Sequence, residues 1–295
     1  MQNKISISGF ADEISVRFRT QLRVVGELGM KYVCLRTING KSIAKYTAPE
    51  AEKKLVPLLS EAGIKVSSLG SPIGKVNIDD DEAFALQLKQ LENLCKVCKV
   101  LSCKYIRVFS FFMPKGENPS LYKDAVLAKL RQFVQIAEKH EIILIHENEK
   151  DIFGDTAARC RLILDEINSP YFKAAFDAAN FVQCKENPLD AFKLLQDKVV
   201  YIHIKDAVTS SNENVLCGEG EGQIPEMLKC AFENGYNGFL TLEPHLVLFG
   251  SLQSLETGDV KNLFTHKKAK NGADGYHLQY DALCGILNTL NINIQ

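Results

Sequence analysis

The sequence predicts an α/β protein in which eight consecutive strand–helix units form a (β/α)8, or TIM, barrel. Short runs of β-branched and apolar residues recur along the chain, and each is followed by a longer segment of helical periodicity. Eight such units fit the 295 residues, because one unit takes about 30 to 35 residues. No change in composition and no Pro-, Gly- or Ser-rich linker marks a second domain. We therefore expect residues 1–295 to form a single barrel.

The predicted strands are the apolar runs that begin the eight units. The fifth run leads directly into His146 and Glu147, so we expect this strand to continue into them. In chain order the runs are 5–9, 32–36, 65–69, 105–109, 142–145, 174–177, 199–203 and 239–243.

Amphipathic segments between these runs predict the helices, as in residues 18–28 and 122–140. Gly29, Gly63 and Gly235 stand one to three residues before a predicted strand, where a helix end favours a left-handed residue. A doubly wound open sheet is the alternative architecture. It loses its main support because no Gly-x-Gly-x-x-Gly follows the first strand.

A long loop is predicted at residues 246–275, between the eighth strand and the last helix. Loops of this length usually act as lids, binding elements or subunit contacts. We expect this loop to cover substrate access or to form a contact in a homo-oligomer or with a partner subunit.

Composition excludes several classes of protein. Lys and Arg total 35 against 36 Asp and Glu, for a net charge of −1, so no positive field favours nucleic acid or an anionic membrane. The N-terminus lacks a signal-peptide pattern, and no apolar stretch is long enough to span a bilayer. We expect a cytoplasmic protein with nine reduced cysteines. Cys95-x-x-Cys98, with Cys103 beyond, is interpreted as part of a buried helix face rather than a metal site.

Four consecutive predicted strands end in potential metal ligands. In a TIM barrel, the active site lies at the C-terminal ends of the strands. Burying such groups together is costly unless they share a cation or hydrogen bonds. Three carboxylates and one imidazole suit Mn²⁺ first, with Mg²⁺, Co²⁺ or Zn²⁺ as alternatives. The residues are Glu147, Asp177, His203 and Glu243.

The chain resembles the xylose-isomerase-like TIM-barrel superfamily, described as sugar phosphate isomerases/epimerases. The resemblance covers nearly the whole chain, and the segments that contain the four candidate ligands are its more specific part. The segments that carry it are Gly9-Phe-Ala-Asp-Glu13, Ser71-Pro-Ile-Gly-Lys75, Arg107-Val-Phe-Ser110, His146-Glu-Asn-Glu149, Phe176-Asp-Ala-Ala-Asn-Phe181, His203-Ile-Lys-Asp206 and Leu242-Glu-Pro-His245.

The resemblance implies that the four candidate ligands hold one divalent cation and that Glu147 and Glu243 also move protons. Two positions depart from the ketose 3-epimerase pattern. Asn180 stands where these enzymes carry a His, and Lys205 with Asp206 stands where they carry an Arg. The apurinic endonuclease branch needs several early His ligands for three zinc ions. This chain has no His before His140, so it cannot build that three-zinc site.

Five further polar residues are candidates for substrate binding. Strand alternation places Lys205 on the face of His203 and places His245 on the face of Glu243. A salt bridge with a nearby acid is an equal alternative for Lys205. His146 points away from the barrel axis if its strand is regular. The five are Arg107, His146, Asn180, Lys205 and His245.

Two glycine-containing segments are candidate anion sites. The run Gly218-Glu-Gly-Glu-Gly222 follows the seventh strand, near the usual phosphate position of TIM barrels. Its two glutamates would repel phosphate, so we interpret it as a shaped turn. Gly74-Lys75 is the better anion candidate.

The leading hypothesis is a metal-dependent isomerase or epimerase for a sugar or polyol derivative. The cation would stabilise an enediolate, with Glu147 and Glu243 as base and acid on opposite faces. The first alternative is a lyase on a keto-sugar, like the inosose dehydratases or C-glycoside-cleaving subunits. The second is a sugar-binding barrel without turnover.

Overall fold

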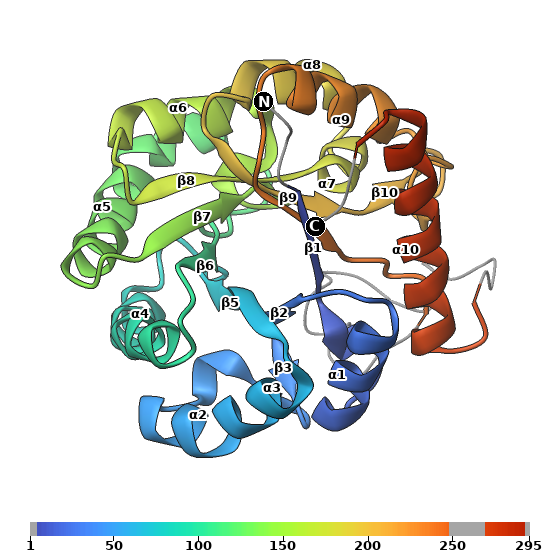
Figure 1. Ribbon diagram of the computed structural model, residues 1–295. Helices are drawn as coiled ribbons and strands as arrows, with labels where there is room; N and C mark the ends of the chain where they lie inside the picture. Colours follow the sequence, from blue (N-terminus) through green and yellow to red (C-terminus); the bar gives the residue numbers. More distant parts are fainter. Residues whose placement is uncertain (1–4, 248–268, 293–295) are drawn as a thin grey trace.

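The computed structural model describes residues 5–247 and 269–292, and in them eight parallel strands form a nearly closed barrel surrounded by helices (Figure 1). The predicted (β/α)8 fold is confirmed. Each barrel strand overlaps one of the predicted apolar runs, although β5 continues four residues beyond its run and β8 begins two residues earlier. The barrel strands are β1 (Ser6–Gly9), β2 (Tyr32–Leu35), β5 (Lys65–Ile73), β6 (Tyr105–Val108), β7 (Ile143–Glu147), β8 (Phe172–Asp177), β9 (Val199–Ile204) and β12 (Phe239–Leu242).

The strands follow the order β1-β12-β9-β8-β7-β6-β5-β2. β1 and β2 then meet through a single parallel bridge between Phe10 and Cys34. This bridge lies at the C-terminal ends of both strands. It brings the segment after β1 beside the end of β2, where further site residues lie.

Helices cover the outside of the barrel. Gly63 ends one of them in the left-handed conformation (φ 64°), as the sequence predicts, and Gly29 and Gly235 also have positive φ. The helices are α1 (Phe18–Glu27), α2 (Ala48–Lys54), α3 (Val56–Ala62), α4 (Asp81–Val100), α5 (Lys123–Lys139), α6 (Ala157–Ile167), α7 (Ala178–Gln183), α8 (Pro188–Leu195), α9 (Ile224–Glu233) and α10 (Gly272–Thr289).

Short elements occupy several connections between the barrel strands and the helices. The two small hairpins were not predicted, because two-residue strands carry too little pattern to detect. The short elements are η1 (Ala11–Glu13), β3 (Thr37–Ile38) with β4 (Lys41–Ser42), η2 (Ile43–Lys45), η3 (Pro119–Tyr122), η4 (Phe153–Asp155), and β10 (Asp206–Ala207) with β11 (Asn214–Val215).

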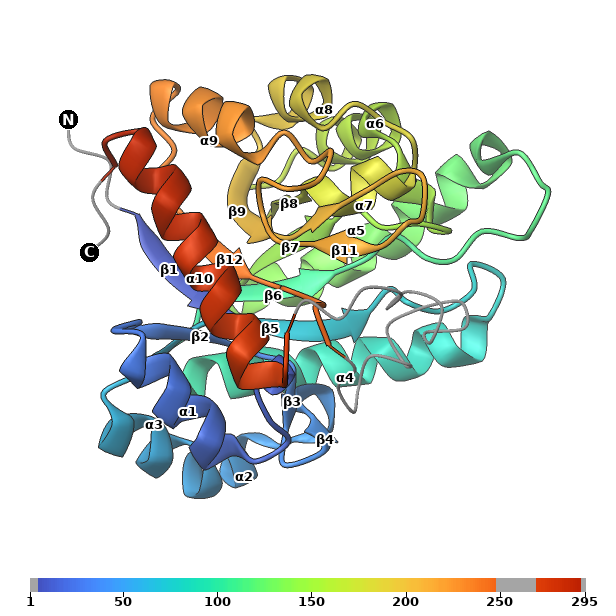
Figure 2. The same cartoon turned by 90° about the vertical axis from the view of Figure 1, so that its right-hand side faces the viewer.

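Most of the predicted loop at 246–275 lies outside the described residues. Its last part differs from the prediction, because α10 already begins at Gly272, with Asn271 accepting a hydrogen bond from the Asp274 backbone. Figure 2 shows α10 across the outer side of the barrel, where it contacts β12. Within the described ranges, no helix has both the length and the apolar character needed to cross a bilayer.

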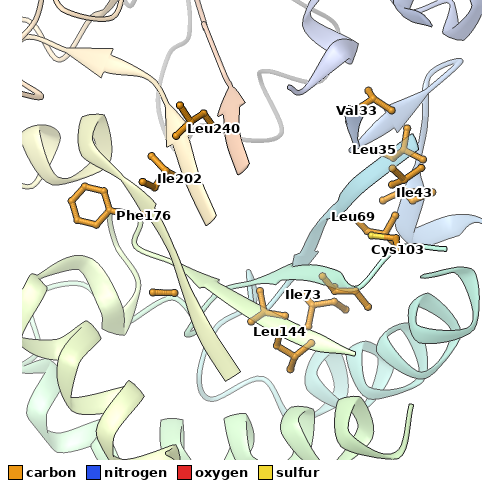
Figure 3. Close-up of a cluster of buried hydrophobic side chains, with 14 of the residues drawn as sticks. Val33, Leu35, Ile43, Leu69, Ile73, Cys103, Leu144, Phe176, Ile202 and Leu240 are labelled. Carbon is orange, nitrogen blue, oxygen red and sulfur yellow. The ribbon is translucent and has the colours of Figure 1, made fainter. Parts of the chain in front are cut away.

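Strand alternation separates two apolar layers. The main core lies between the strands and the helices, and Figure 3 shows part of it, including Leu144, Phe176, Ile202 and Leu240. The alternate residues point into the barrel, where a second cluster contains Ile145, Ala175 and Tyr201. Two residues further along β7, β8 and β9, the next inward positions are therefore Glu147, Asp177 and His203.

Cys95 and Cys98 are buried on α4, as predicted. Burial raises the pKa of the Cys95 thiol to about 12, so the thiol stays protonated and behaves as a small apolar group.

Candidate metal centre

Four side chains from the C-terminal ends of neighbouring strands meet inside the barrel. Glu147 ends β7, Asp177 ends β8, His203 lies near the end of β9, and Glu243 follows β12 directly. One ligand atom from each lies within 4.8 Å of the others. All four are buried, with exposures between 0% and 3%. The structure thus brings together the four candidate ligands that the sequence predicted.

His203 lies at the centre of this four-residue cluster. Its Nδ1 is 2.9 Å from Glu147 Oε1, 3.2 Å from Glu243 Oε2 and 3.8 Å from Asp177 Oδ2. The ring is held edge-on by Phe10, with the ring centroids 5.2 Å apart. The imidazole is therefore fixed in orientation and directed at the carboxylates.

Each carboxylate of the cluster also has a basic partner. Lys205 Nζ lies 3.0 Å from Asp177 Oδ2, and Arg107 Nη1 lies 3.0 Å from Glu147 Oε2. The third partner is Arg36, whose Nη1 donates to Glu243 Oε1 at 2.7 Å. The predicted salt-bridge role of Lys205 is therefore present, with Asp177 as the acid.

These contacts determine the charge of the two glutamates. Burial would raise the pKa of Glu147, but His203 and Arg107 outweigh it and hold that pKa at about 2. Burial is likewise outweighed at Glu243, where Lys205, His203 and His245 lower the pKa well below its usual range. Both glutamates are carboxylates at neutral pH.

Burial disfavours a charged His203, yet the ion pair with Glu147 and hydrogen bonds to the cluster carboxylates raise its pKa well above the ordinary value. His203 therefore carries a proton among the three acids. A bound cation would need this imidazole in its neutral form, as metal ligation requires.

Two observations test whether the residues fit a divalent cation. Buried oxygens of Glu147, Asp177 and Glu243 accept no hydrogen bond of good geometry within the described residues. In addition, five buried carboxylates lie in or beside the cluster with three buried basic side chains, which leaves two negative charges when these acids are ionised and the imidazoles are neutral; a sixth buried carboxylate, Asp206, is bound by glycine N–H groups outside this set. The carboxylates are Asp12, Glu13, Glu147, Asp177 and Glu243, and the basic side chains are Arg36, Arg107 and Lys205. A divalent cation supplies the missing charge, so the site fits one.

Hydrogen bonds with Asn148 and Asn180 hold Asp177 in position. Asn148 binds the Asp177 backbone on both sides, accepting from its N–H at 3.0 Å and donating to its carbonyl at 2.9 Å. Asp177 Oδ1 caps α7 by accepting from the Asn180 N–H at 2.9 Å. Oδ2 is therefore the oxygen that faces the cluster, where it meets Lys205.

Four of the five candidate substrate-binding residues lie beside the cluster. Arg107 and Lys205 pair with its acids, and Asn180 Oδ1 accepts from Lys205 Nζ at 2.7 Å. His245 Nε2 lies 3.4 Å from Glu243 Oε1.

His146 is the exception. β7 is regular through Glu147, so alternation turns His146 away from the barrel axis. Its ring packs near Phe172, with centroids 6.0 Å apart, and a Cβ at Gly154 would lie 2.5 Å from its Cε1. The structure therefore places His146 in the layer between the strands and the helices.

Sequence reasoning assigned no role to Arg36, Asp12 or Glu13. Arg36 contacts both acids and Glu243, and all three residues are buried. The rule that identified the four ligands could have found Arg36, since it is a charged residue directly after an apolar strand.

The glycine run at 218–222 encloses a carboxylate of the chain itself. The N–H groups of Gly218 and Gly220 donate to Asp206 Oδ2 at 2.8 and 3.0 Å, and that of Gly222 donates to Oδ1 at 2.8 Å. The predicted role as a shaped turn therefore agrees with this geometry, with Asp206 filling the anion position. At the other anion candidate, Lys75 Nζ lies 3.0 Å from Glu149 Oε2.

A cavity of about 1220 Å³ opens beyond the C-terminal ends of β5, β6 and β7. It is lined by residues of the connecting loops, such as Asn77, Phe112 and Asp151. None of the four clustered residues lines this cavity. The four residues of the cluster therefore lie deeper than this cavity, inside the barrel.

Comparison with known proteins agrees with this architecture. Residues 22–256 match the sequence profile of the family described as "Xylose isomerase-like TIM barrel". A curated relative, the probable L-ribulose-5-phosphate 3-epimerase UlaE of Mycoplasma pneumoniae, is 22% identical over 190 residues. The match covers 64% of this chain but only 60% of that protein's length.

Solved structures share the fold at low sequence identity. A crystal structure of the IOLI protein with a bound zinc atom has a TM-score of 0.76 and 15% identity, covering 97% of this chain and 99% of the other. A D-tagatose 3-epimerase-like protein has a TM-score of 0.72 and 17% identity, with the same coverage of 97% and 99%.

Proposed function

Because the chain belongs to the xylose isomerase-like TIM-barrel family, we propose that it is a divalent-metal-dependent isomerase or epimerase. Its substrate is a sugar or polyol derivative, and the reacting carbon lies next to a carbonyl group. The observation that carries this proposal is the convergence of Glu147, Asp177, His203 and Glu243 on one buried point. A sugar-binding barrel without turnover would have no need for such a charged interior.

We take these four residues as the ligands, with Mn²⁺ as the first expectation. When bound, a divalent cation supplies Lewis-acid stabilisation of negative charge on substrate oxygens. The zinc in the IOLI structure supports a divalent ion in a barrel of this shape.

In the proposed reaction, Glu147 and Glu243 move the protons. Glu147, ionised because its pKa is about 2, accepts the proton from the substrate carbon at its carboxylate. Glu243 is also ionised at rest, so it takes a proton from solvent and passes it to the opposite face of the resulting enediolate. Exchange with solvent then restores both groups, so the configuration at that carbon is inverted.

The neighbouring polar groups orient the substrate. Lys205 contacts Asp177 and Asn180, and an ammonium group has three N–H donors. Among the described residues this leaves one donor for a substrate oxygen. Arg107 and His245 lie beside the two glutamates, so we propose that they bind substrate oxygens there. His146 has no role in this proposal, because it faces the helix layer.

The test is to measure metal content and then to incubate the protein in D₂O with a panel of substrates. The panel contains free ketoses, L-ribulose 5-phosphate, inososes and oxidised glycosides. We expect a product of unchanged mass, apart from deuterium incorporated at the reacting carbon. Loss of water or an aglycone would instead support the lyase alternative. Binding of a sugar with no deuterium uptake and no turnover would support the non-catalytic barrel.

A further inference from the structure

A second group of potential ligands lies directly beside the four-residue cluster. Ligand atoms of Glu13, Glu243 and His245 lie within 4.8 Å of one another, and all three residues are buried. Glu243 belongs to both groups, with Oε2 near His203 and Oε1 near His245. The donors alone would therefore suit two adjacent ions that share one carboxylate.

The guanidinium of Arg36 already uses the oxygens of this second group. Nη1 lies 2.7 Å from Glu243 Oε1, and Nη2 lies 3.2 Å from Glu13 Oε1. These are the same two oxygens that lie 3.4 and 3.5 Å from His245 Nε2. The positively charged guanidinium of Arg36 therefore bridges the two carboxylates of the second group.

Arg36 is fixed in this position from two further sides. Its Nε donates to Asp12 Oδ2 at 2.9 Å, and its Cζ lies 4.5 Å from the centre of the Phe10 ring. Phe10 can pack there because residue 70 is glycine, where a Cβ would lie 2.6 Å from Phe10 Cε1. The contacts with Asp12 and Phe10 therefore hold the guanidinium in a fixed position.

The four-residue cluster is arranged differently. There Arg107 approaches Glu147 at 3.0 Å but Glu243 only at 3.9 Å, and Lys205 approaches Asp177 at 3.0 Å. These basic side chains each pair closely with one acid at the edge of the cluster. Arg36, in contrast, lies between two acids of the second group.

We propose that Arg36 takes the place of a second divalent ion and so limits the chain to one bound ion. Its guanidinium is permanently charged and binds carboxylates in a planar fork, which a hydrated ion cannot displace without breaking the hydrogen bond to Asp12. The inference rests on the proposed function, because it takes the four-residue cluster as the site of the first ion. It assigns Arg36 as a positioning residue for Glu243 through the contact at Oε1.

Replacing Arg36 by alanine should open the second group to a metal ion. Arg36→Ala removes one positive charge and leaves Glu13, Glu243 and His245 as an open set of two carboxylates and one imidazole. Such a set suits a divalent ion. The variant should therefore gain an ion site that the natural chain lacks.

The experiment counts Mn²⁺ per chain by equilibrium dialysis and metal analysis of the full-length protein. We expect Arg36→Ala to bind one more Mn²⁺ than the natural chain, and the two ions should show spin coupling by electron paramagnetic resonance. Arg36→Ala/Glu13→Gln, which removes one donor of the second group, should lose this extra ion. An unchanged count in Arg36→Ala would overturn the proposal.

Arg36→Ala leaves three acids without their guanidinium, so it could fail to fold without metal. Arg36→Ala/Asp12→Asn removes one of these charges, keeps all three donors and should also bind the extra ion. If this variant does not fold in the absence of metal either, its refolding yield is measured against Mn²⁺ concentration: a yield that rises with Mn²⁺ supports the proposal, and a yield that Mn²⁺ does not change contradicts it.

The extra Mn²⁺ bound by Arg36→Ala can be measured whether or not the four-residue cluster binds an ion. A natural chain that binds no Mn²⁺ would contradict the metal centre of the proposed function, whereas the gain of one ion in Arg36→Ala would still support the role of Arg36. Conversely, one ion in both proteins would leave the proposed function intact and overturn the role of Arg36.

Discussion

His203 Nδ1 lies 2.9 Å from Glu147 Oε1, although 56 residues separate the two in the chain. Their strands, β9 and β7, do not pair with each other, because both pair with β8 between them. The contact therefore exists only because inward side chains from alternate strands meet across the barrel interior.

The first prediction concerns Asp177. Asp177→Asn should lower the affinity for Mn²⁺ by at least about tenfold, since a neutral amide is a poorer ligand than a carboxylate. The fold should remain, because the Asn oxygen can still cap α7 by accepting from the Asn180 N–H. Asp177→Ala should lose the metal and about 1 kcal/mol of capping free energy as well. Metal titration and urea unfolding measure the two effects, and an unchanged affinity for Mn²⁺ in either variant would remove Asp177 from the site.

The second prediction concerns proton transfer. Glu147→Gln should lower turnover and deuterium uptake by about a hundredfold to ten-thousandfold, because an amide cannot accept the substrate proton. Glu138→Gln, an exposed residue on α5, is the control and should keep the natural rate. A natural rate in Glu147→Gln would mean that another group is the base.

The third prediction tests the placement of His146. His146→Leu should keep kcat/KM within about threefold of the natural value, since the ring packs near Phe172 outside the barrel interior. Steady-state kinetics on the substrate found in the panel measures this. A hundredfold loss in a folded variant would instead bring His146 back as a candidate base.

The fourth prediction concerns the glycine run. Asp206→Asn should lower the free energy of unfolding by about 1 to 3 kcal/mol, because the amide nitrogen cannot accept from the glycine N–H groups, of which that of Gly222 is buried. Urea unfolding measures the change. Glu219→Gln neutralises an exposed acid of the same run and should alter stability by less than about 0.5 kcal/mol. Equal effects of the two substitutions would show that the N–H contacts of Asp206 contribute nothing to stability.

The sequence by itself determined the eight strands and the four residues that meet at their ends. Short apolar runs define the strands. The alternation of side chains along a strand predicts the inward side of Glu147 and the outward side of His146. A barrel brings all C-terminal strand ends to one face, so strand-end position was enough to place Asp177, His203 and Glu243 together.

Only the tertiary structure decided which partners these residues have. Arg36 and Glu243 are 207 residues apart, and their 2.7 Å contact depends on where β1, β2 and β12 close the barrel. The same holds for Lys205, which pairs with Asp177 rather than with its neighbour Asp206. The physical reason is that alternation determines the face of a strand to which a side chain points. The strength of an ion pair depends instead on a distance across the interior, which strand twist, barrel closure and the packing of Phe10 determine together.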